Sequence, residues 1–128
     1  MELQPKKPSA KGPADWFTGD VYIDPIVQSQ PNSAVAVSAV HFTPGARTAW
    51  HSHSRGQTLY VTEGQGFVQT RAEPLVAVRP GDVVLIPADE WHWHGATADH
   101  FMTHLSITEG PAQWGDHVSD AEYPGGAS

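Results

Sequence analysis

The sequence predicts one all-β domain in which short strands form a sandwich or a barrel. Apolar, β-branched segments alternate with turn sequences rich in glycine and proline, at the short and even spacing of such folds. No long stretch has the periodicity of an amphipathic helix. The chain has 128 residues, which is enough for one hydrophobic core but too few for two independent domains.

The first elements are a tail and an arm. Residues 1–13 contain three prolines and all three lysines, so we expect a mobile N-terminal tail. The pair Trp16 and Phe17 follows, and it can cover the mouth of a barrel, contact a partner subunit or simply pack locally. A short strand that Pro25 ends or borders completes the arm. We place the arm and the barrel in residues 14–118.

The main strands are predicted from β-branched and aromatic segments that lie between turns. They comprise residues 33–42, 57–62, 66–71, 75–78, 82–86, 91–94 and 101–108. Residues 119–128 are expected to form a C-terminal tail. Within it, Ser119 and Glu122 have the spacing of a capping box and predict one helical turn, and residues 125–128 are expected to fray.

Charge and composition exclude several classes of function. The formal net charge is −7, and from Gly12 onward four arginines face thirteen acidic residues, which gives −9. Because nucleic-acid binding depends on clustered lysine and arginine, we expect no nucleic-acid partner. The chain has no cysteine, which excludes disulfides, thiolate metal ligands and thiol nucleophiles.

The sequence also bears on location and assembly. No apolar run approaches the roughly 18 residues of a membrane span, and the first residues lack the apolar stretch of a signal peptide. We therefore expect a cytoplasmic protein that binds a small molecule and no membrane. Exposed strand edges and the Trp16–Phe17 pair predict a homodimer or a homotetramer.

Two segments predict a metal site. His51 and His53 are two residues apart, so on a strand both imidazoles face the same side, and Gln57 follows a glycine turn that can bring its side chain round. His92 and His94 have the same spacing on a second predicted strand.

The first of these segments fits the first sequence motif of the cupins, G-x5-H-x-H-x3-E-x6-G. Gly45, His51, His53 and Gly64 all fall at the required positions, and Gln57 stands where cupins usually have glutamate.

The second segment resembles the second cupin motif, G-x5-P-x-G-x2-H-x3-N. Gly81, Pro87 and His92 match it, whereas Asp89 replaces the glycine and Ala96 replaces the asparagine. The resemblance covers residues 33–108 and implies a double-stranded β-helix, the jelly-roll barrel of a single-domain cupin.

The resemblance implies that His51, His53, Gln57 and His92 bind one divalent transition metal. Manganese, iron, cobalt, nickel and zinc all suit three imidazoles and one amide oxygen. Because Gln57 is neutral, the cation keeps its full charge and should lower the pKa of a bound hydroxyl more effectively than beside a glutamate. Gln57 can instead hydrogen-bond to a bound water or to a neighbouring histidine.

Within the cupins, the chain resembles the small bacterial hydroxynitrile lyases that are manganese-dependent and (R)-selective. The matching stretches are residues 11–19, 45–51, 56–59, 80–84, 91–96 and 102–105. In that group the substrate site is lined by the residues that match His94, His104, Ser38, Val40 and Thr108. The resemblance thus implies manganese as the metal and these five residues as the substrate site.

The implied activity is reversible cleavage of cyanohydrins such as (R)-mandelonitrile to an aldehyde and cyanide. The metal would act as Lewis acid and His94 or His104 as general base, and either histidine can instead orient a metal ligand. Two other classes stay open: an iron or manganese dioxygenase or oxidative-cleavage enzyme, and a non-catalytic small-molecule-binding domain.

Overall fold

The computed structural model describes residues 1–124, in which all regular structure is β-strand. The strands are β1 (Ala10–Lys11), β2 (Phe17–Thr18), β3 (Val21–Val27), β4 (Val35–Phe42), β5 (Arg47–Thr48), β6 (His51–His53), β7 (Gln57–Gly64), β8 (Gly66–Thr70), β9 (Val76–Val78), β10 (Val83–Ile86), β11 (His92–Ala96), β12 (Met102–Glu109) and β13 (Ala112–Trp114). Within this range no helix is long and apolar enough to cross a membrane. The predicted fraying of residues 125–128 lies outside the described residues.

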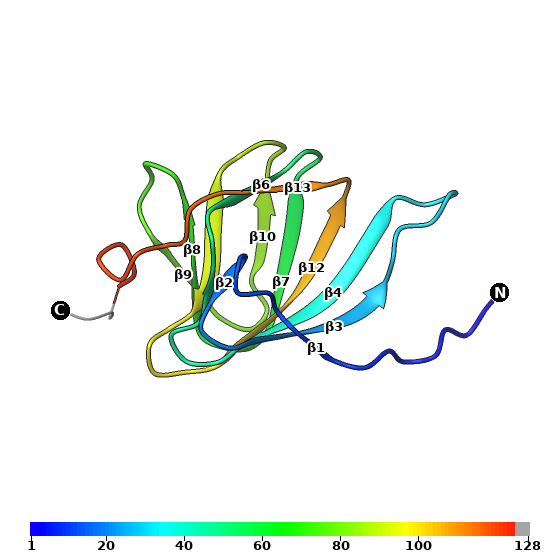
Figure 1. Ribbon diagram of the computed structural model, residues 1–128, viewed down its shortest axis with the longest axis horizontal. Coiled ribbons are helices and arrows are strands. Elements are labelled where there is room, and N and C mark those ends of the chain that lie inside the picture. Colours follow the sequence, from blue (N-terminus) through cyan, green and yellow to red (C-terminus); the bar gives the residue numbers. More distant parts are fainter. Residues whose placement is uncertain (125–128) are drawn as a thin grey trace.

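The strands form two antiparallel sheets that curl into a half-barrel (Figure 1). One sheet has the order β1-β3-β4-β12-β7-β10. The other has the order β13-β6-β11-β5-β2, and β8 and β9 extend it from β11. The predicted all-β class and single jelly-roll domain are confirmed.

The seven predicted main strands are all present as β4 and β7 to β12, and their ends differ from the prediction by at most two residues. The strand in the arm, β3, continues through Pro25 instead of ending there. Pro25 can be accommodated because β1 pairs only with Tyr22 and Ile23, so no neighbour on that side needs its missing N–H. A register shift follows between Pro25 and Val27.

The two terminal segments are more ordered than the sequence indicated. Part of the expected N-terminal tail forms β1, and the Gly12 N–H next to it donates to the Val21 carbonyl at 2.7 Å. At the other end, β13 pairs with β6, and the residues after it contribute Val118 and Tyr123 to a buried cluster.

The predicted single helical turn near Ser119 is present, since the Tyr123 N–H donates to the Ser119 carbonyl four residues earlier at 3.0 Å, and its capping box also forms. The Ser119 N–H donates to Glu122 Oε1 at 2.9 Å, and the Glu122 N–H donates to Ser119 Oγ at 3.2 Å. The chain makes only this one turn, because Pro124 follows within two residues and cannot donate the next backbone hydrogen bond.

Two hydrophobic clusters stabilise the packing of the sheets. The larger fills the interior and contains Phe17, Val21, Val40, Phe42, Ala46, Val61, Val68, Val78, Ala96 and Met102. The smaller contains Trp50, Trp93, Val118 and Tyr123, and it covers the outer face of β11 with the C-terminal segment. The Tyr123 hydroxyl donates to the Ala96 carbonyl at 2.6 Å and fastens this segment. Trp93 of β11 packs into this smaller cluster, on the outer face of the sheet. The residues before and after it on the strand, His92 and His94, therefore face the barrel interior.

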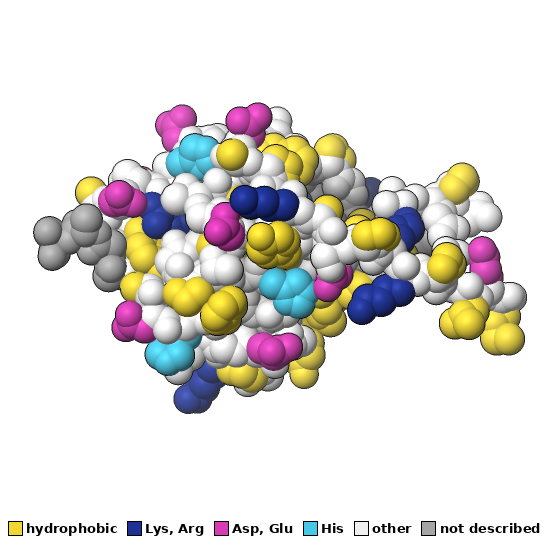
Figure 2. Space-filling model, turned by 60° about the horizontal axis from the view of Figure 1, so that its bottom comes forward, with side chains coloured by type: hydrophobic (Ala, Val, Ile, Leu, Met, Phe, Trp, Pro, Cys, Tyr) yellow, Lys and Arg dark blue, Asp and Glu magenta, His cyan; other side chains and the backbone are white. Residues whose placement is uncertain are grey.

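Basic side chains lie apart from one another on the face shown in Figure 2. Two exposed basic residues of the structure are paired with acids: Lys11 with Asp20 at 3.2 Å, and Arg55 with Glu109 at 3.4 Å. These pairs are exposed, so each contributes little to stability. They do, however, neutralise positive charge at the surface of an acidic protein.

Candidate metal centre

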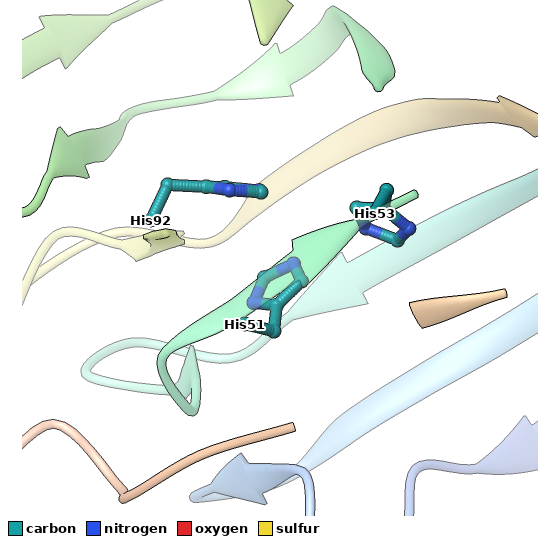
Figure 3. Close-up of side chains that lie close together, drawn as sticks. All are labelled: His51, His53 and His92. Carbon is teal, nitrogen blue, oxygen red and sulfur yellow. The ribbon is translucent and has the colours of Figure 1, made fainter. Parts of the chain in front are cut away.

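Three histidines meet in the barrel interior. His51 and His53 come from β6, and His92 comes from β11, where it is the cross-strand partner of His51. The potential ligand nitrogens of all three lie within 4.8 Å of one another, and all three side chains are buried (Figure 3). The alternation expected from the sequence therefore brings the three predicted histidine ligands together.

Hydrogen bonds fix which nitrogen of two of these rings is free. His51 Nδ1 lies 2.9 Å from the Ala49 carbonyl, and His92 Nδ1 lies 2.8 Å from the Glu90 carbonyl. A carbonyl only accepts, so in the neutral rings the proton is on Nδ1 and Nε2 carries a lone pair. Such backbone partners orient imidazoles for metal binding.

Gln57 completes the candidate ligand set. Its Oε1 lies 3.0 Å from His92 Nε2, so two lone pairs face each other across this short distance. His53 Nε2 is also buried and has no hydrogen-bond partner. A cation held by these atoms would satisfy all of them, so the residues fit one divalent transition metal.

The local backbone explains how Gln57 reaches this position. Gly56 has a φ of +84°, and a side chain there would come within 2.7 Å of the Ile86 carbonyl oxygen. Only glycine permits this tight turn at the start of β7 without strain.

Burial keeps the candidate ligands neutral. The pKa of His51 is well below its ordinary value, chiefly because burial penalises the charged ring. Burial also lowers the pKa of His92, and it lowers that of His53 to about 4, with the charge of the neighbouring His92 acting in the same direction. Neutral imidazole at pH 7 is the form that binds metals.

His94 and His104 form a second pair beside the three-histidine cluster. His94 shares the inward face of β11 with His92, and His104 projects from β12 in the opposite sheet. His94 Nδ1 and His104 Nε2 are 2.9 Å apart, which allows one N–H to lie between the rings. The outer nitrogens, His94 Nε2 and His104 Nδ1, are buried and have no partner.

This pair is also neutral at pH 7. Burial is the main cause in both rings, since it lowers the pKa of His94 well below its usual range and that of His104 to about 4. With one N–H shared between the rings, one outer nitrogen carries a proton and the other carries a lone pair. The pair can therefore accept a proton on one side and donate one on the other.

A cavity of about 280 Å³ joins the two groups of histidines. It is amphipathic, because its lining combines four of the histidines and Gln57 with apolar side chains. The apolar and hydroxyl-bearing lining consists of Trp16, Phe17, Ile23, Val40 and Trp114, with Ser38, Thr48, Ser106 and Thr108. Ser38, Val40 and Thr108, which the resemblance implied, thus all border this space.

Four lining residues were missed from the sequence: Ile23, Thr48, Ser106 and Trp114. Trp114 stacks on His51 with ring centroids 4.5 Å apart, and Thr48 Oγ1 accepts the backbone N–H of His94 at 3.1 Å. Ser106 Oγ accepts a hydrogen bond from Gln57 Nε2 at 2.8 Å. Ser106 could have been found from its alternation with His104 on one strand. Trp114 carried no such signal, because β13 was not predicted.

The structure also accounts for a departure from the cupin motif. Asp89, which stands at a glycine position of that motif, has a φ of +63°. Aspartate is one of the few residues that tolerate this left-handed conformation. The Asp89 N–H donates to the His53 carbonyl at 2.9 Å, so the turn still supports a candidate ligand.

The fold and the histidine cluster define a small β-barrel protein with a buried polar centre, and comparison with known proteins identifies its family. The cupin domain matches residues 38–108, which is more than half of the chain. The chain belongs to the cupin family.

A relative supports a closer relationship. The chain is 51% identical over 119 residues to (R)-mandelonitrile lyase from Granulicella tundricola, which covers 90% of this chain and 91% of that protein. The resemblance to a bacterial cupin hydroxynitrile lyase is thereby confirmed.

Solved structures agree with the fold. A cupin-like protein from Thermotoga maritima has a TM-score of 0.88 and 39% identity, with 99% of this chain and 98% of that chain covered. An acetylacetone dioxygenase from Acinetobacter johnsonii has a TM-score of 0.73 and 14% identity, with 91% and 79% covered. At that low identity the second likeness shows the fold alone.

Proposed function

We propose that this chain is a metal-dependent carbon–carbon lyase that reversibly cleaves (R)-mandelonitrile-type cyanohydrins to an aldehyde and cyanide. The observation that carries the proposal is the 51% identity, over nearly the full length, with a protein named (R)-mandelonitrile lyase. The amphipathic cavity between the two histidine groups supports it, because such a substrate has one polar carbon and one aromatic ring.

In this proposal His51, His53, Gln57 and His92 hold one divalent metal per chain, with manganese as the first choice and iron, cobalt, nickel or zinc as other occupants. When bound, the metal supplies Lewis acidity that lowers the pKa of a substrate hydroxyl. The neutral, buried imidazoles and the amide oxygen of Gln57 support this assignment.

His94 and His104 divide the proton transfers. The outer nitrogen that carries a lone pair takes the hydroxyl proton, the C–C electron pair leaves with cyanide, and the carbonyl bond forms. The other outer nitrogen donates its proton to cyanide, so that hydrogen cyanide is released. The proton between the rings moves across their hydrogen bond, so both rings end neutral with their tautomers exchanged, and the reverse sequence gives cyanohydrin synthesis.

The cavity lining orients the substrate. We assign the aryl group to the apolar residues of the lining, next to Val40 and the tryptophans, and we place the reacting carbon near Ser38 and Thr108. His94 and His104 are themselves buried, which limits the access of water to the two rings.

One assay tests this function. The purified protein is analysed for metals and is then given (R)-mandelonitrile at acidic pH, with and without added Mn²⁺, while benzaldehyde release is recorded against a heat-denatured blank. We expect turnover that follows metal content and proceeds without oxygen. Uptake of oxygen with the substrate would favour the dioxygenase alternative, and a fully metallated protein without turnover would refute the lyase proposal.

The neutrality of Gln57 gives a first prediction. Gln57→Glu is expected to keep the metal, because a carboxylate binds a cation at least as well as an amide. Its added negative charge should nevertheless raise the pKa of the bound hydroxyl and lower kcat at least tenfold. Metal analysis and initial rates check this, and unchanged turnover in a fully metallated variant would show that the charge argument is wrong.

We also propose that the chain forms a homodimer or a homotetramer. The support is the outer face of the six-stranded sheet, where two cross-strand rows are mostly apolar: Val37, Ile107, Thr58 and Leu85 in one row, and Ala39, Leu105, Tyr60 and Val83 in the other. The solvent face of an antiparallel sheet is usually polar, so these rows are suited to packing against a second copy.

A charge in one row should break this association. Leu105→Asp is expected to shift the protein to the monomer in size-exclusion chromatography with light scattering, because two like charges would be buried at a twofold contact. Phe101→Asp is the control, since Phe101 is exposed and lies outside both rows. A parent protein that is already monomeric would exclude the assembly.

A further inference from the structure

Ser106 lies where it can control the orientation of a candidate metal ligand. It projects inward from β12, between His104 and Thr108, and its cross-strand partners are Leu59 and Ser38. Its Oγ lies 2.8 Å from Gln57 Nε2 and accepts an N–H from that amide.

The two ends of the Gln57 amide are not equivalent for a cation. With Nε2 bound to Ser106, the oxygen faces His92 Nε2 at 3.0 Å, where both atoms carry lone pairs. A half-turn of the amide would place its NH₂ group against the imidazole nitrogens and give a favourable hydrogen bond. That alternative orientation offers no oxygen to a metal, because an amide nitrogen is a donor only.

A serine hydroxyl can accept an N–H or donate to an oxygen, so it serves either amide orientation in the empty site. Once a cation binds the Gln57 oxygen, the amide N–H groups need an acceptor on the side away from the histidines. We propose that Ser106 is a positioning residue, whose hydroxyl holds the Gln57 carboxamide with its oxygen directed at the metal centre. Without that hydroxyl, the bound state would leave a buried N–H unsatisfied. The inference rests on the proposed metal site, but it concerns metal affinity and not the chemistry of the substrate.

Two variants of nearly identical shape test this role. Ser106→Thr keeps the hydroxyl, whereas Ser106→Val replaces it with a methyl group, and both are β-branched residues suited to a strand. Titration of the metal-free proteins with MnCl₂ in a calorimeter should give a Kd near that of the parent for Ser106→Thr. For Ser106→Val we expect a Kd about 10–100 times higher, as found when groups that orient metal ligands are removed.

The control removes a hydroxyl of the same kind away from the cavity. Thr62 Oγ1 donates to the Thr103 carbonyl at 3.2 Å, outside the lining residues, so Thr62→Val should leave the Kd for Mn²⁺ unchanged. Equal affinities for the threonine and valine variants at position 106 would overturn the proposal.

A double-mutant cycle shows whether Ser106 acts through Gln57. In the Gln57→Ala background there is no amide to orient, so Ser106→Val should cause no additional loss of Mn²⁺ affinity. An additive loss would mean that Ser106 affects the metal in another way and would contradict the proposal. If the protein cleaves no cyanohydrin, the lyase proposal fails but these affinities can still be measured, so the two failures are distinguishable.

Discussion

Replacing His92 with alanine is expected to empty the metal centre and to lower the melting temperature by about 10 °C. His92 is fully buried, and its ring centroid lies 4.2 Å from that of His51, so its loss removes the ligand that joins β11 to β6. A metal present at about 100 times its Kd contributes about 2.7 kcal/mol to stability, which corresponds to this shift for a domain of this size.

Elemental analysis and thermal unfolding, each with and without chelator, measure the two effects. The parent protein with chelator shows the effect of losing the metal while the His92 side chain is kept. The chelator should lower the melting temperature of the parent strongly and that of the variant very little. His100→Ala is the control, since His100 is exposed and lies outside the cluster. His51→Ala should behave like His92→Ala. Full metal content in either variant would contradict the ligand assignment.

His94→Ala and His104→Ala are each expected to lower kcat by about 10²–10⁴-fold while the metal content stays unchanged. General acid and base catalysis contribute on that order, and the proposed mechanism assigns both transfers to this pair. The two rings share one hydrogen bond and act as a unit, so the double variant should lose little more than either single variant. Initial rates with (R)-mandelonitrile, together with metal analysis, check this.

The pH dependence gives a second measure of the same pair. Burial lowers the pKa of both histidines, and to about 4 for His104, so the basic form persists below the ordinary histidine range. The parent rate should stay level as the pH falls through 6.5 and should decrease only toward pH 4. If both alanine variants keep their metal and turn over at the parent rate, the histidines are structural and the proposed mechanism fails.

Local sequence pattern was enough to predict the strands, and the resemblance to the cupin motifs indicated which candidate ligands would meet. His51 and His53 alternate on one strand, and His92 and His94 alternate on another, so period-2 geometry alone turns each pair to one side. The glycine turn at Gly56 is equally local, because its positive φ is a property of a short segment. Local pattern therefore predicted the all-β class and the facing of each histidine pair, whereas the jelly-roll fold and the ligand set followed from the cupin resemblance.

The tertiary structure decided how the rest of the site is assembled. β12 lies between β4 and β7, which places Ser106 against Gln57, and the packing of the two sheets places His104 against His94. Neither contact can be derived from spacing along the chain, because the first depends on the register of β12 against β7 and the second on how the sheets face each other.

The strands near the two chain ends, β1 and β13, were also not predictable from the sequence. The composition of residues 1–13 predicted a mobile tail, yet β1 joins the six-stranded sheet, and β13, which was not predicted, places Trp114 on His51. Short polar segments with little propensity of their own become strands when a neighbouring edge offers backbone hydrogen bonds and apolar surface to cover. That edge exists only once the barrel has formed, so the sequence alone indicated the metal centre, whereas folding decided which residues enclose it.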